Sequence, residues 1–267
     1  MDIHRVTPGS PVDLSSIDTR GTPGFDGGKE EARRALADLT ARLAELQTLL
    51  FAQGRHRLLV VLQALDTGGK DGTIRAVFSP VNPQGVKVAS FTRPTPIELA
   101  HDYLWRVHSE VPGNGEIVVF NRSHYEDVLV VRVHGLVPEE VWARRYGHIN
   151  AFERLLADEG TTIVKFYLHI SKDEQKERFQ ERLDEPHKHW KFNPADIEVR
   201  QRWNDFQTAS EQAIARCSTA HAPWFVIPAN RNWYRNACIA RIVRKTIEAT
   251  NPEWPALDDD MSGIVIE

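Results

Sequence analysis

The chain has 267 residues, 41% of them hydrophobic, which is enough to form the core of one large α/β domain or of two small ones. Its 33 lysines and arginines and 37 aspartates and glutamates give a formal net charge of -4, which excludes the overall positive field of a nucleic-acid-binding protein. Two cysteines without metal-ligand spacing indicate no structural zinc, and no apolar run reaches membrane-spanning length, so we expect a cytoplasmic protein without a nucleic-acid or membrane partner.

The first 28 residues contain three prolines and show no hydrophobic periodicity. We therefore expect an N-terminal arm, residues 1–28, that either lies over the domain or has no fixed structure. From Lys29 to about Gln53, leucines recur at three- and four-residue spacing, which predicts a helix with one apolar face. That face belongs most simply to the core of the same chain, and a dimer interface is the alternative.

Five apolar segments predict strands at Leu58–Leu62, Val86–Phe91, Glu116–Phe120, Thr162–Ile170 and Pro223–Ile227. Helical patterns lie between them, at about Thr73–Phe78, Pro96–His108, Glu139–Ala157, from Ser171 onward, at Ala195–Cys217 and at Asn230–Ala249. Because strands and helices alternate throughout, we predict a doubly wound parallel sheet in a three-layer α/β/α fold. The domain is expected to span residues 29–250, followed by a C-terminal surface tail at 251–267 with acidic residues at Asp258–Asp260.

The segment Leu58–Thr73 has the layout of a phosphate-binding loop, because a buried strand ends in a glycine-rich turn with one lysine before a helix begins. Backbone N–H groups in such a turn form a cradle for phosphate oxygens, and Lys70 can neutralise their charge. The match to the usual pattern G-x-x-x-x-G-K-S/T is partial, since Ala64 replaces the first glycine and Asp71 the hydroxyl residue. A simple glycine turn beside a solvated lysine is the alternative.

The predicted strand Glu116–Phe120 runs directly into the polar segment Asn121–Asp127. Ligands bind at the carboxyl ends of strands in open α/β sheets, so this segment and the loop are expected to face one crevice. Arg122 can clamp a phosphate there with two parallel hydrogen bonds. Phosphoryl transfer also needs carboxylates that hold magnesium, although each acid could instead cap a helix or form a salt bridge. The candidate ligands are Asp66, Asp127, Glu126 and, more weakly, Asp71.

A charge-rich segment at about residues 172–202 lies between the last two predicted strands. One interpretation is a solvated helical hairpin whose charges pair on the surface, as Glu174 and Arg178 do at i,i+4 spacing. The other interpretation, which the position favours, is a lid. In a lid, Arg178 and Arg182 close over phosphates and stabilise the charge of the transition state.

Five motifs of this chain resemble the polyphosphate kinase 2 family: ALDTGGKDGT, DYLWRVH, FNRSHYEDVLVVRVHGLVP, LHISKDEQKERFQERL and WFVIPANRNWYRN. The likeness extends over about Phe25–Ile247, and the NRSHYED segment, with Asn121 and Glu126, is similar to the class III members. The missing hydroxyl after Lys70 fits this family, which does not keep a hydroxyl at that position.

The resemblance implies a P-loop kinase-like fold with a helical lid, and a phosphotransferase that moves the terminal phosphoryl group of inorganic polyphosphate to AMP and ADP. The products would be ADP and ATP, in a reversible reaction without a covalent enzyme intermediate. The resemblance also implies Mg²⁺ as the cofactor, with Mn²⁺ as a substitute, and a homo-dimer or homo-tetramer. The residues expected to act in catalysis are Asp66, Lys70, Arg122, Glu126 and Asp127, with Arg178 and Arg182 on the lid and with Asp66 and Asp127 as metal ligands.

The resemblance further implies contacts to phosphate or nucleotide from Thr67, Gly68, Gly69, Asp71, Gly72, Thr73, Arg93, Arg106 and Asn121. A long polyanion also needs a cationic path outside the active centre. The candidates for this polyphosphate track are Arg55, Lys188, Lys191, Arg231 and Arg235, for which surface solubility is the alternative role. Asn121 stands where other classes have an aspartate, so the division of the metal between Asp66 and Asp127 stays open.

Two other functions fit the same motifs. An ATP-dependent kinase of nucleotides or small metabolites would share the loop, the lid and magnesium, but its compact ATP pocket would need no extended basic groove. A nucleotide-binding regulatory module without catalysis is the second alternative, and the missing serine or threonine after Lys70 favours it. The choice of phosphoryl donor separates the first alternative from a polyphosphate-dependent enzyme.

Overall fold

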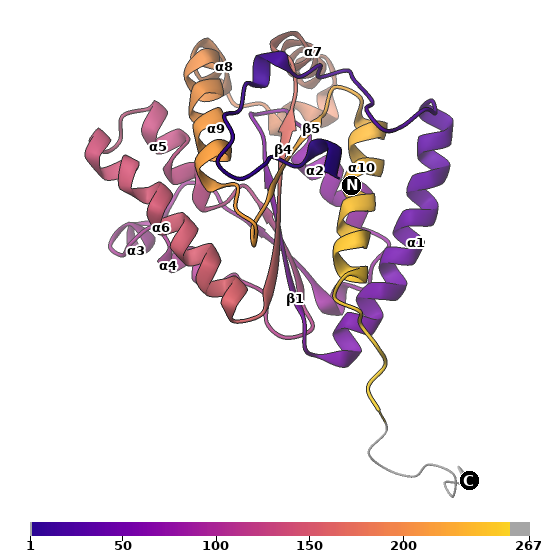
Figure 1. The fold of residues 1–267 in the computed structure, drawn as a ribbon. Helices are drawn as coiled ribbons and strands as arrows, with labels where there is room; N and C mark the ends of the chain where they lie inside the picture. The colour runs from indigo at the N-terminus through magenta and orange to yellow at the C-terminus, as the bar shows by residue number, and fades with distance from the viewer. Residues whose placement is uncertain (1, 257–267) are drawn as a thin grey trace, which may run out of the picture.

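The computed structural model of the chain describes residues 2–256. Within these residues, five strands form one parallel sheet in the order β2-β3-β1-β4-β5 (Figure 1). The strands are β1 (Arg57–Gln63), β2 (Val86–Ser90), β3 (Ile117–Asn121), β4 (Thr161–His169) and β5 (Trp224–Pro228). All five overlap the predicted strands, so the parallel α/β fold is confirmed. The acidic residues Asp258–Asp260 of the predicted tail lie outside the described part of the chain.

Strand β1 occupies the centre of the sheet, where Val60 pairs with Val119 of β3 on one side and with Val164 of β4 on the other. Its side chains are buried on both faces, which explains why the strand is apolar along nearly its whole length. From β1 the chain runs to β2 and then β3 on one side of β1, and it then crosses to β4 and β5 on the other side. The crevice at the carboxyl end of β1 is therefore the switch point where ligands bind in this class of fold.

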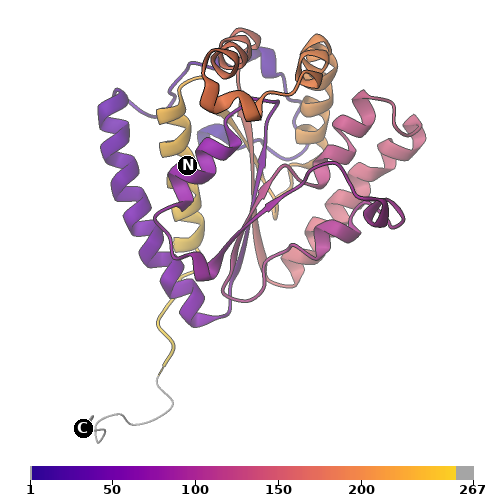
Figure 2. The same ribbon diagram turned by 180° about the vertical axis from the view of Figure 1, so that it is seen from behind.

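Helices cover both faces of the sheet (Figures 1 and 2). One face is covered by α1 (Lys29–Gln53), α2 (Lys70–Phe78) and α10 (Asn232–Glu248), and the other by α6 (Glu139–Asp158) and α9 (Trp203–Cys217). Leu43, Leu46 and Leu50 of α1 are almost wholly buried in the core that includes α10. The leucine face of this helix therefore packs in the core of its own chain, which was the simpler of the two interpretations. Among residues 2–256, no helix combines the length and apolar character needed to cross a membrane.

The predicted helix at Pro96–His108 is interrupted. Only two single turns form, α3 (Pro96–Leu99) and α4 (Trp105–His108). Between them the Asp102 side chain accepts a hydrogen bond from the Leu104 N–H at 2.9 Å, and this local bond turns the chain out of the helical path. The hydrophobic spacing was therefore correct for each turn but not for a continuous helix.

The charge-rich segment forms three short helices: α7 (Lys172–Asp184), η5 (Pro186–Lys191) and α8 (Ala195–Gln201). The predicted helix Ala195–Cys217 breaks at Arg202, whose φ of -92° and ψ of 25° are not helical, and α9 begins at the next residue. The remaining short helices are α5 (Val130–Val133), η1 (Asp2–His4), η2 (Leu14–Ser16), η3 (Pro83–Gly85) and η4 (His124–Asp127).

The N-terminal arm, residues 2–28, lies over the domain, which decides between the two expectations for it. Arg5 forms an antiparallel bridge with Phe225 on β5. Leu14 is fully buried, and its carbonyl oxygen lies 2.9 Å from His169 Nε2 at the end of β4. The arm thus covers the outer edge of β5, which would otherwise expose unpaired backbone groups.

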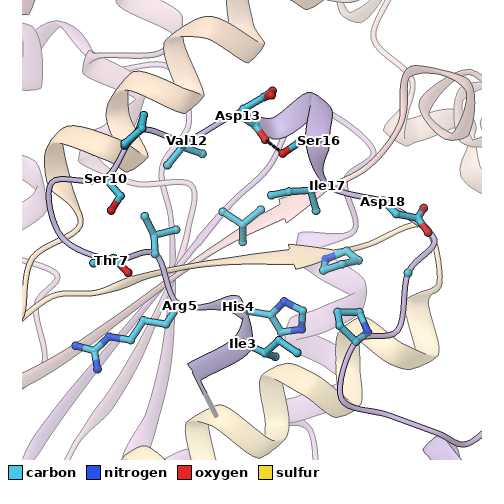
Figure 3. A pocket seen from close by; sticks show the side chains of 16 residues that line it. Ile3, His4, Arg5, Thr7, Ser10, Val12, Asp13, Ser16, Ile17 and Asp18 are labelled. Atoms are coloured by element: carbon cyan, nitrogen blue, oxygen red, sulfur yellow. Dashed lines mark hydrogen bonds between the residues drawn. The ribbon is translucent and has the colours of Figure 1, made fainter.

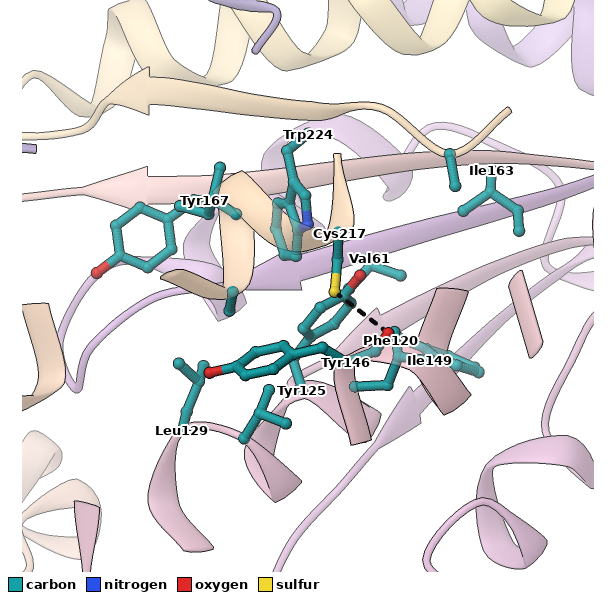
Figure 4. Close-up of a cluster of buried hydrophobic side chains, with 14 of the residues drawn as sticks. Val61, Phe120, Tyr125, Leu129, Tyr146, Ile149, Ile163, Tyr167, Cys217 and Trp224 are labelled. Atoms are coloured by element: carbon teal, nitrogen blue, oxygen red, sulfur yellow. Dashed lines mark hydrogen bonds between the residues drawn. The ribbon is translucent and has the colours of Figure 1, made fainter. Parts of the chain in front are cut away.

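A buried ionic network underlies the segment that follows β3. Lys165 on β4 donates hydrogen bonds to Glu153 Oε2 (2.5 Å), to Tyr125 Oη (2.8 Å) and to the carbonyl oxygen of Cys217 (2.7 Å). His124 Nε2 lies 3.2 Å from Glu153 Oε1. Figure 4 shows Tyr125 and Cys217 inside the surrounding aromatic core. Because His124 and Tyr125 belong to η4, the network fixes the position of this short helix at the crevice.

Glu153→Gln is expected to lower the free energy of unfolding by about 3 kcal/mol, because it leaves the Lys165 ammonium buried without an opposite charge. Urea denaturation followed by circular dichroism measures this loss. The control is Asp158→Asn on the same helix, since the Asp158 ion pair with Arg154 is exposed and contributes little. Equal losses in the two variants would contradict the assigned role of the network.

Candidate active site

The loop between β1 and α2 has the backbone of a phosphate cradle. Thr67 adopts a φ of 61° although it is not glycine, and Gly69 adopts a φ of 97°. A Cβ atom at Gly69 would collide with the Arg235 guanidinium, and one at Gly68 would collide with Ala64. Both glycines are therefore required by close approach, and left-handed backbone of this kind is typical of loops whose N–H groups bind anions.

Within residues 2–256, two hydroxyl groups of this region are buried without a hydrogen-bond partner, those of Thr67 and Thr73. Thr67 lies in the loop, and Thr73 follows Gly72 in the first part of α2. Buried polar groups are normally paired, so orphaned hydroxyls beside a glycine cradle suit a ligand with oxygen acceptors such as phosphate.

Lys70 is the first residue of α2, and its side chain is only 8% exposed. Its Nζ donates a hydrogen bond to the Ala64 carbonyl oxygen at 3.0 Å. Burial, and then the charge of Arg122, lowers the pKa of Lys70 to about 8, although the Asp66 carboxylate opposes this shift. The solvated-lysine alternative does not hold, because a partly desolvated ammonium of this kind gains strongly from an approaching anion.

Arg122 joins two carboxylates at the end of β3. Its Nη2 donates to Asp66 Oδ1 at 2.5 Å, and its Nη1 lies 3.6 Å from Glu126 Oε2. Gln63 Nε2 also donates to Glu126, at 3.1 Å. Arg122 has a φ of 62°, an uncommon value for a residue with a side chain. The strained backbone turns its guanidinium back to the loop, so that Asp66 and Glu126 share one cation.

Asp127 lies in a different environment from its neighbour Glu126. Arg145 Nη1 on α6 donates to Asp127 Oδ1 at 2.8 Å and to its carbonyl oxygen at 3.1 Å, and the same guanidinium lies 4.7 Å from the centre of the Tyr103 ring. Burial raises the pKa of Asp127 to about 6, although Arg145 opposes the shift. Asp66 and Asp127 therefore do not share a partner, and residues 2–256 contain no group of three or more metal-ligating side chains.

Arg106 lies on the same side of the crevice as Asp127, and its charge also acts on that carboxyl. It donates to the Thr92 carbonyl oxygen at 2.9 Å and lies 5.5 Å from the centre of the Phe91 ring. Arg93, in the loop between β2 and α3, is exposed to solvent. The core thus positions Arg106, whereas Arg93 lies at the surface.

Asp71 is engaged by two side chains. Asn121 Nδ2 donates to its Oδ1 at 3.0 Å, and Lys191 of the lid lies 3.5 Å from its Oδ2. Although burial opposes it, the Asn121 hydrogen bond and the Lys191 charge hold the pKa of Asp71 below its usual value. Asp71 thus connects the loop helix α2 to β3 and to the lid, where the usual loop pattern has a hydroxyl.

The segment α7–η5–α8 packs over the loop, as the lid interpretation requires. Arg178 donates from Nη1 to the Thr67 carbonyl oxygen and from Nη2 to the Ala229 carbonyl oxygen, both at 2.8 Å. Arg182 donates to the Lys191 carbonyl oxygen at 3.0 Å. Arg178 therefore reaches the phosphate cradle, whereas Arg182 holds the lid together.

A cavity of about 440 Å³ opens beside the loop, between α7, the start of α1 and the segment after β5. Its cations are Lys29, Arg178, Arg231 and Arg235, and its acids are Glu174 and Glu181. Glu174 pairs with Arg178, and Glu181 pairs with a lysine of η5. An excess of positive charge thus faces the cavity.

Arg235 is the most buried cation of this cavity, with 3% of its surface exposed. Burial, and then the charge of Arg178, lowers the pKa of Arg235 to about 9. Among residues 2–256 it forms no ion pair with a carboxylate, and its bonds go to Asn236 Oδ1 and to the Gly68 carbonyl oxygen. An unpaired buried guanidinium beside the loop is a strong anion site.

The other residues expected on a polyphosphate track are not brought to this cavity. Arg55 precedes β1, so it lies at the amino end of the sheet, opposite the loop. Lys188 forms ion pairs with Glu181 (2.6 Å) and Glu185 (2.9 Å). Lys191 contacts Asp71, as described above. Only Arg231 and Arg235 of the five expected residues line the cavity.

A sequence model of the family described as Polyphosphate kinase 2 matches residues 27–255. The chain belongs to the polyphosphate kinase 2 family. It is 58% identical to the AMP/ADP-polyphosphate phosphotransferase of Meiothermus ruber, over 100% of both chains. It is also 42% identical to the ADP-polyphosphate phosphotransferase of Rhodopseudomonas palustris, in a match that covers 94% of this chain and 91% of the relative.

Structural comparison gives the same family. The crystal structure of Polyphosphate Kinase 2 from Arthrobacter aurescens TC1 superimposes with a TM-score of 0.94 at 44% sequence identity, over 97% of this chain and 92% of that chain. The resemblance of the loop, lid and strand-end motifs to the polyphosphate kinase 2 family is therefore confirmed, together with the P-loop kinase-like fold.

Three residues that shape the site of this polyphosphate kinase 2 member carry no signal in the sequence. Arg145 holds Asp127 from the middle of an ordinary amphipathic helix. Gln175 of the lid donates to the Asp66 carbonyl oxygen at 3.1 Å, and Asp196 pairs with Arg182 at 3.7 Å. Each contact joins residues that are at least 14 positions apart in the chain, and no local pattern in the sequence marks it.

Proposed function

We propose that this member of the polyphosphate kinase 2 family is a polyphosphate-dependent nucleotide kinase. It transfers the terminal phosphoryl group of inorganic polyphosphate to AMP and ADP, forming ADP and ATP reversibly. The observation that carries the proposal is the 58% identity over the whole chain to a relative named AMP/ADP-polyphosphate phosphotransferase. The buried Lys70 between two cationic regions supports it, because transfer from a polyanion needs charge neutralisation on both sides of the transferred group.

The polyphosphate donor is proposed to enter the cavity beside Arg235, and the nucleotide acceptor to bind on the side of Arg122 and Arg106. A long polyanion needs an opening to solvent with positive charge that carboxylates do not neutralise. Arg231 and Lys29 line the cavity, and within residues 2–256 neither of them forms an ion pair. Lys70 then lies between donor and acceptor. ATP fits this donor site less well, since its few phosphates would not reach the outer cations.

In the proposed reaction, a phosphate oxygen of AMP or ADP attacks the terminal phosphorus of the chain. A P–O bond to the nucleotide forms, the P–O bond to the chain breaks, and polyphosphate shorter by one unit leaves. The enzyme contributes placement and charge: the loop amides and Lys70 bind the transferred group, and Arg122 and Arg178 neutralise charge beside it. No enzyme side chain forms a bond to phosphorus.

We propose Mg²⁺ as the cofactor, with Mn²⁺ as a substitute. Asp66 and Glu126 fit a hard divalent ion, because their largely buried carboxylates converge on Arg122 and offer only oxygen ligands. Such an ion would neutralise charge on the phosphates. Asp127, the second ligand expected from the resemblance, pairs with Arg145 instead of Arg122 and so does not converge with Asp66, and the contacts favour Asp66 with Glu126.

A cytoplasmic homo-dimer or homo-tetramer is proposed for this protein on the basis of the family resemblance. Both cysteines are free and buried, which suits a reducing compartment. Light scattering at several concentrations gives the number of copies, and a monomer at all of them would contradict the proposal.

The deciding experiment incubates the protein with AMP, Mg²⁺ and polyphosphate in the absence of ATP. ADP is expected first and ATP after it, and both are separated by chromatography. If neither ADP nor ATP is formed, the proposal is overturned. A parallel incubation replaces polyphosphate with ATP. Transfer from ATP together with no product from polyphosphate would favour an ordinary nucleotide or metabolite kinase, and nucleotide binding without turnover from either donor would favour a regulatory module.

The pH dependence of kcat/KM for polyphosphate should report the titration of Lys70. Since the pKa of Lys70 in the free protein is about 8, the ammonium needed to bind phosphate is lost as the pH rises through this value. The value of kcat/KM should fall tenfold per pH unit above it. Saturating donor protects the charge, so kcat should fall only at higher pH. Between pH 8 and pH 10 the value of kcat/KM should fall by about two orders of magnitude, so a flat profile from pH 7 to pH 10 would contradict this assignment.

A further inference from the structure

The N-terminal arm (residues 2–28) begins outside the family match, which starts at residue 27, yet it ends next to Lys29, the first residue of α1, which lines the donor cavity. Its path starts at the outer edge of β5 and bends around a hollow of about 560 Å³, whose walls are mostly the arm itself (Figure 3). The arm therefore connects the edge of the sheet to the opening through which the proposed donor enters.

Three contacts join the arm to the segment after β5 and to the first turn of α10, which together span residues 229–235. The Asn230 N–H donates to the Thr19 carbonyl oxygen at 3.1 Å. The Tyr234 hydroxyl donates to the Pro23 carbonyl oxygen at 2.7 Å and lies 2.6 Å from His4 Nε2. Tyr234 is 2% exposed, so its hydroxyl is bonded to the arm instead of to water.

Aromatic packing adds to these bonds. The Phe25 ring lies 6.1 Å from the Trp233 ring and 6.5 Å from the Tyr234 ring, measured between centroids. Arg20 lies 3.6 Å from Glu174, the acid of the lid helix that also pairs with Arg178. The arm thus touches both walls of the donor cavity.

The opposite side of the same segment faces the donor cavity. Arg231 and Arg235 flank Tyr234 in sequence and line the cavity. Arg178 donates to the carbonyl oxygens of Ala229 and Asn230 from the cavity side. The segment 229–235 therefore lies between the arm and Arg178 of the lid. The arm contacts the side of this segment that faces away from the cavity, and Arg231 and Arg235 lie on the cavity side.

We propose that the N-terminal arm is a positioning element of the donor site, which holds Arg231 and Arg235 in the arrangement that binds polyphosphate. The proposal rests on the proposed function. Ordering the segment before the donor arrives removes an entropic cost from donor binding. The acceptor side is independent of the arm, because within residues 2–256 no hydrogen bond or ion pair of Arg122, Asp127 or Arg145 involves the arm.

The test is Tyr234→Phe, which removes the hydroxyl shared by His4 and Pro23 and keeps the ring. The KM for long-chain polyphosphate is expected to rise about five- to tenfold, the effect of losing one or two hydrogen bonds that order the site. The KM for AMP should stay within about twofold of wild type, because the acceptor side does not contact the arm. Both constants come from initial rates of ADP formation.

The matched control is Tyr146→Phe, which removes a tyrosine hydroxyl bonded to Arg132 on the other face of the sheet. Both KM values should be unchanged there. A second variant, Phe25→Ala, removes arm packing without touching a hydrogen bond and should raise the donor KM alone. KM does not depend on the fraction of folded enzyme, so partial instability of a variant does not hide the result.

The outcomes separate this inference from the proposed function. If the wild type uses polyphosphate but Tyr234→Phe and Phe25→Ala both leave the donor KM unchanged, or raise donor and acceptor KM together, the arm does not position the donor site. If the wild type makes no ADP from polyphosphate, the proposed function itself fails.

Discussion

Lys70→Met is expected to lower kcat/KM for polyphosphate by about 1000-fold or more, the range seen when a preorganised charge on a transferred group is removed. The Lys70 ammonium is buried in the cradle and bonded to the Ala64 carbonyl oxygen, so its charge is weakly screened by water. Methionine keeps the length and the apolar stem, which preserves the packing of α2. The loss should appear in the initial rate of ADP formation from AMP and polyphosphate.

Two further substitutions serve as controls, one for the loss of a lysine elsewhere and one for the shape of the cation at position 70. Lys176→Met changes an exposed lysine on α7 that takes part in no ion pair within residues 2–256, and its rate should match wild type. Lys70→Arg should fail to restore activity, because a planar guanidinium cannot take the place of a compact ammonium in the cradle. More than a tenth of wild-type activity in Lys70→Met would contradict the assigned role.

Asp66→Asn is expected to lower kcat by about 100- to 1000-fold and to weaken binding of the divalent cation. The substitution removes the charge of the carboxylate that pairs with Arg122 while keeping its shape. The rate should be measured against Mg²⁺ concentration, and Mn²⁺ binding by calorimetry gives a readout that does not depend on turnover. Asp173→Asn, an exposed acid at the start of α7, is the control.

The second metal ligand can be found in the same experiment. Glu126 shares Arg122 with Asp66, whereas Asp127 is paired with Arg145. Glu126→Gln is therefore expected to weaken Mn²⁺ binding more than Asp127→Asn does. If Asp127→Asn instead weakens Mn²⁺ binding more, the metal ligands are Asp66 and Asp127, the pair expected from the family resemblance. An unchanged metal dependence in Asp66→Asn would remove Asp66 from the metal site altogether.

Structural features that depend only on residues close together in the sequence, such as a buried strand or a glycine-rich loop, could be predicted. A strand buried on both faces must be apolar along its length, which made Leu58–Leu62 recognisable. Left-handed backbone in a loop favours glycine, which marked Gly69 and located the crevice, although Thr67 in the same loop adopts this backbone without being glycine. The helix boundaries were less certain, because one hydrogen bond from the Leu104 N–H to the Asp102 side chain was enough to override a hydrophobic period at residues 96–108.

The sequence by itself thus determined the parallel α/β fold, the loop with Lys70 and the family. Only the tertiary structure decided which charges meet. Asp66 and Arg122 are 56 residues apart, Glu126 and Asp127 are adjacent yet turn to different arginines, and Arg235 is buried against a loop 167 residues away. Such pairings depend on how distant elements pack and on backbone turns such as that of Arg122, and local patterns of hydrophobicity and charge carry no record of either.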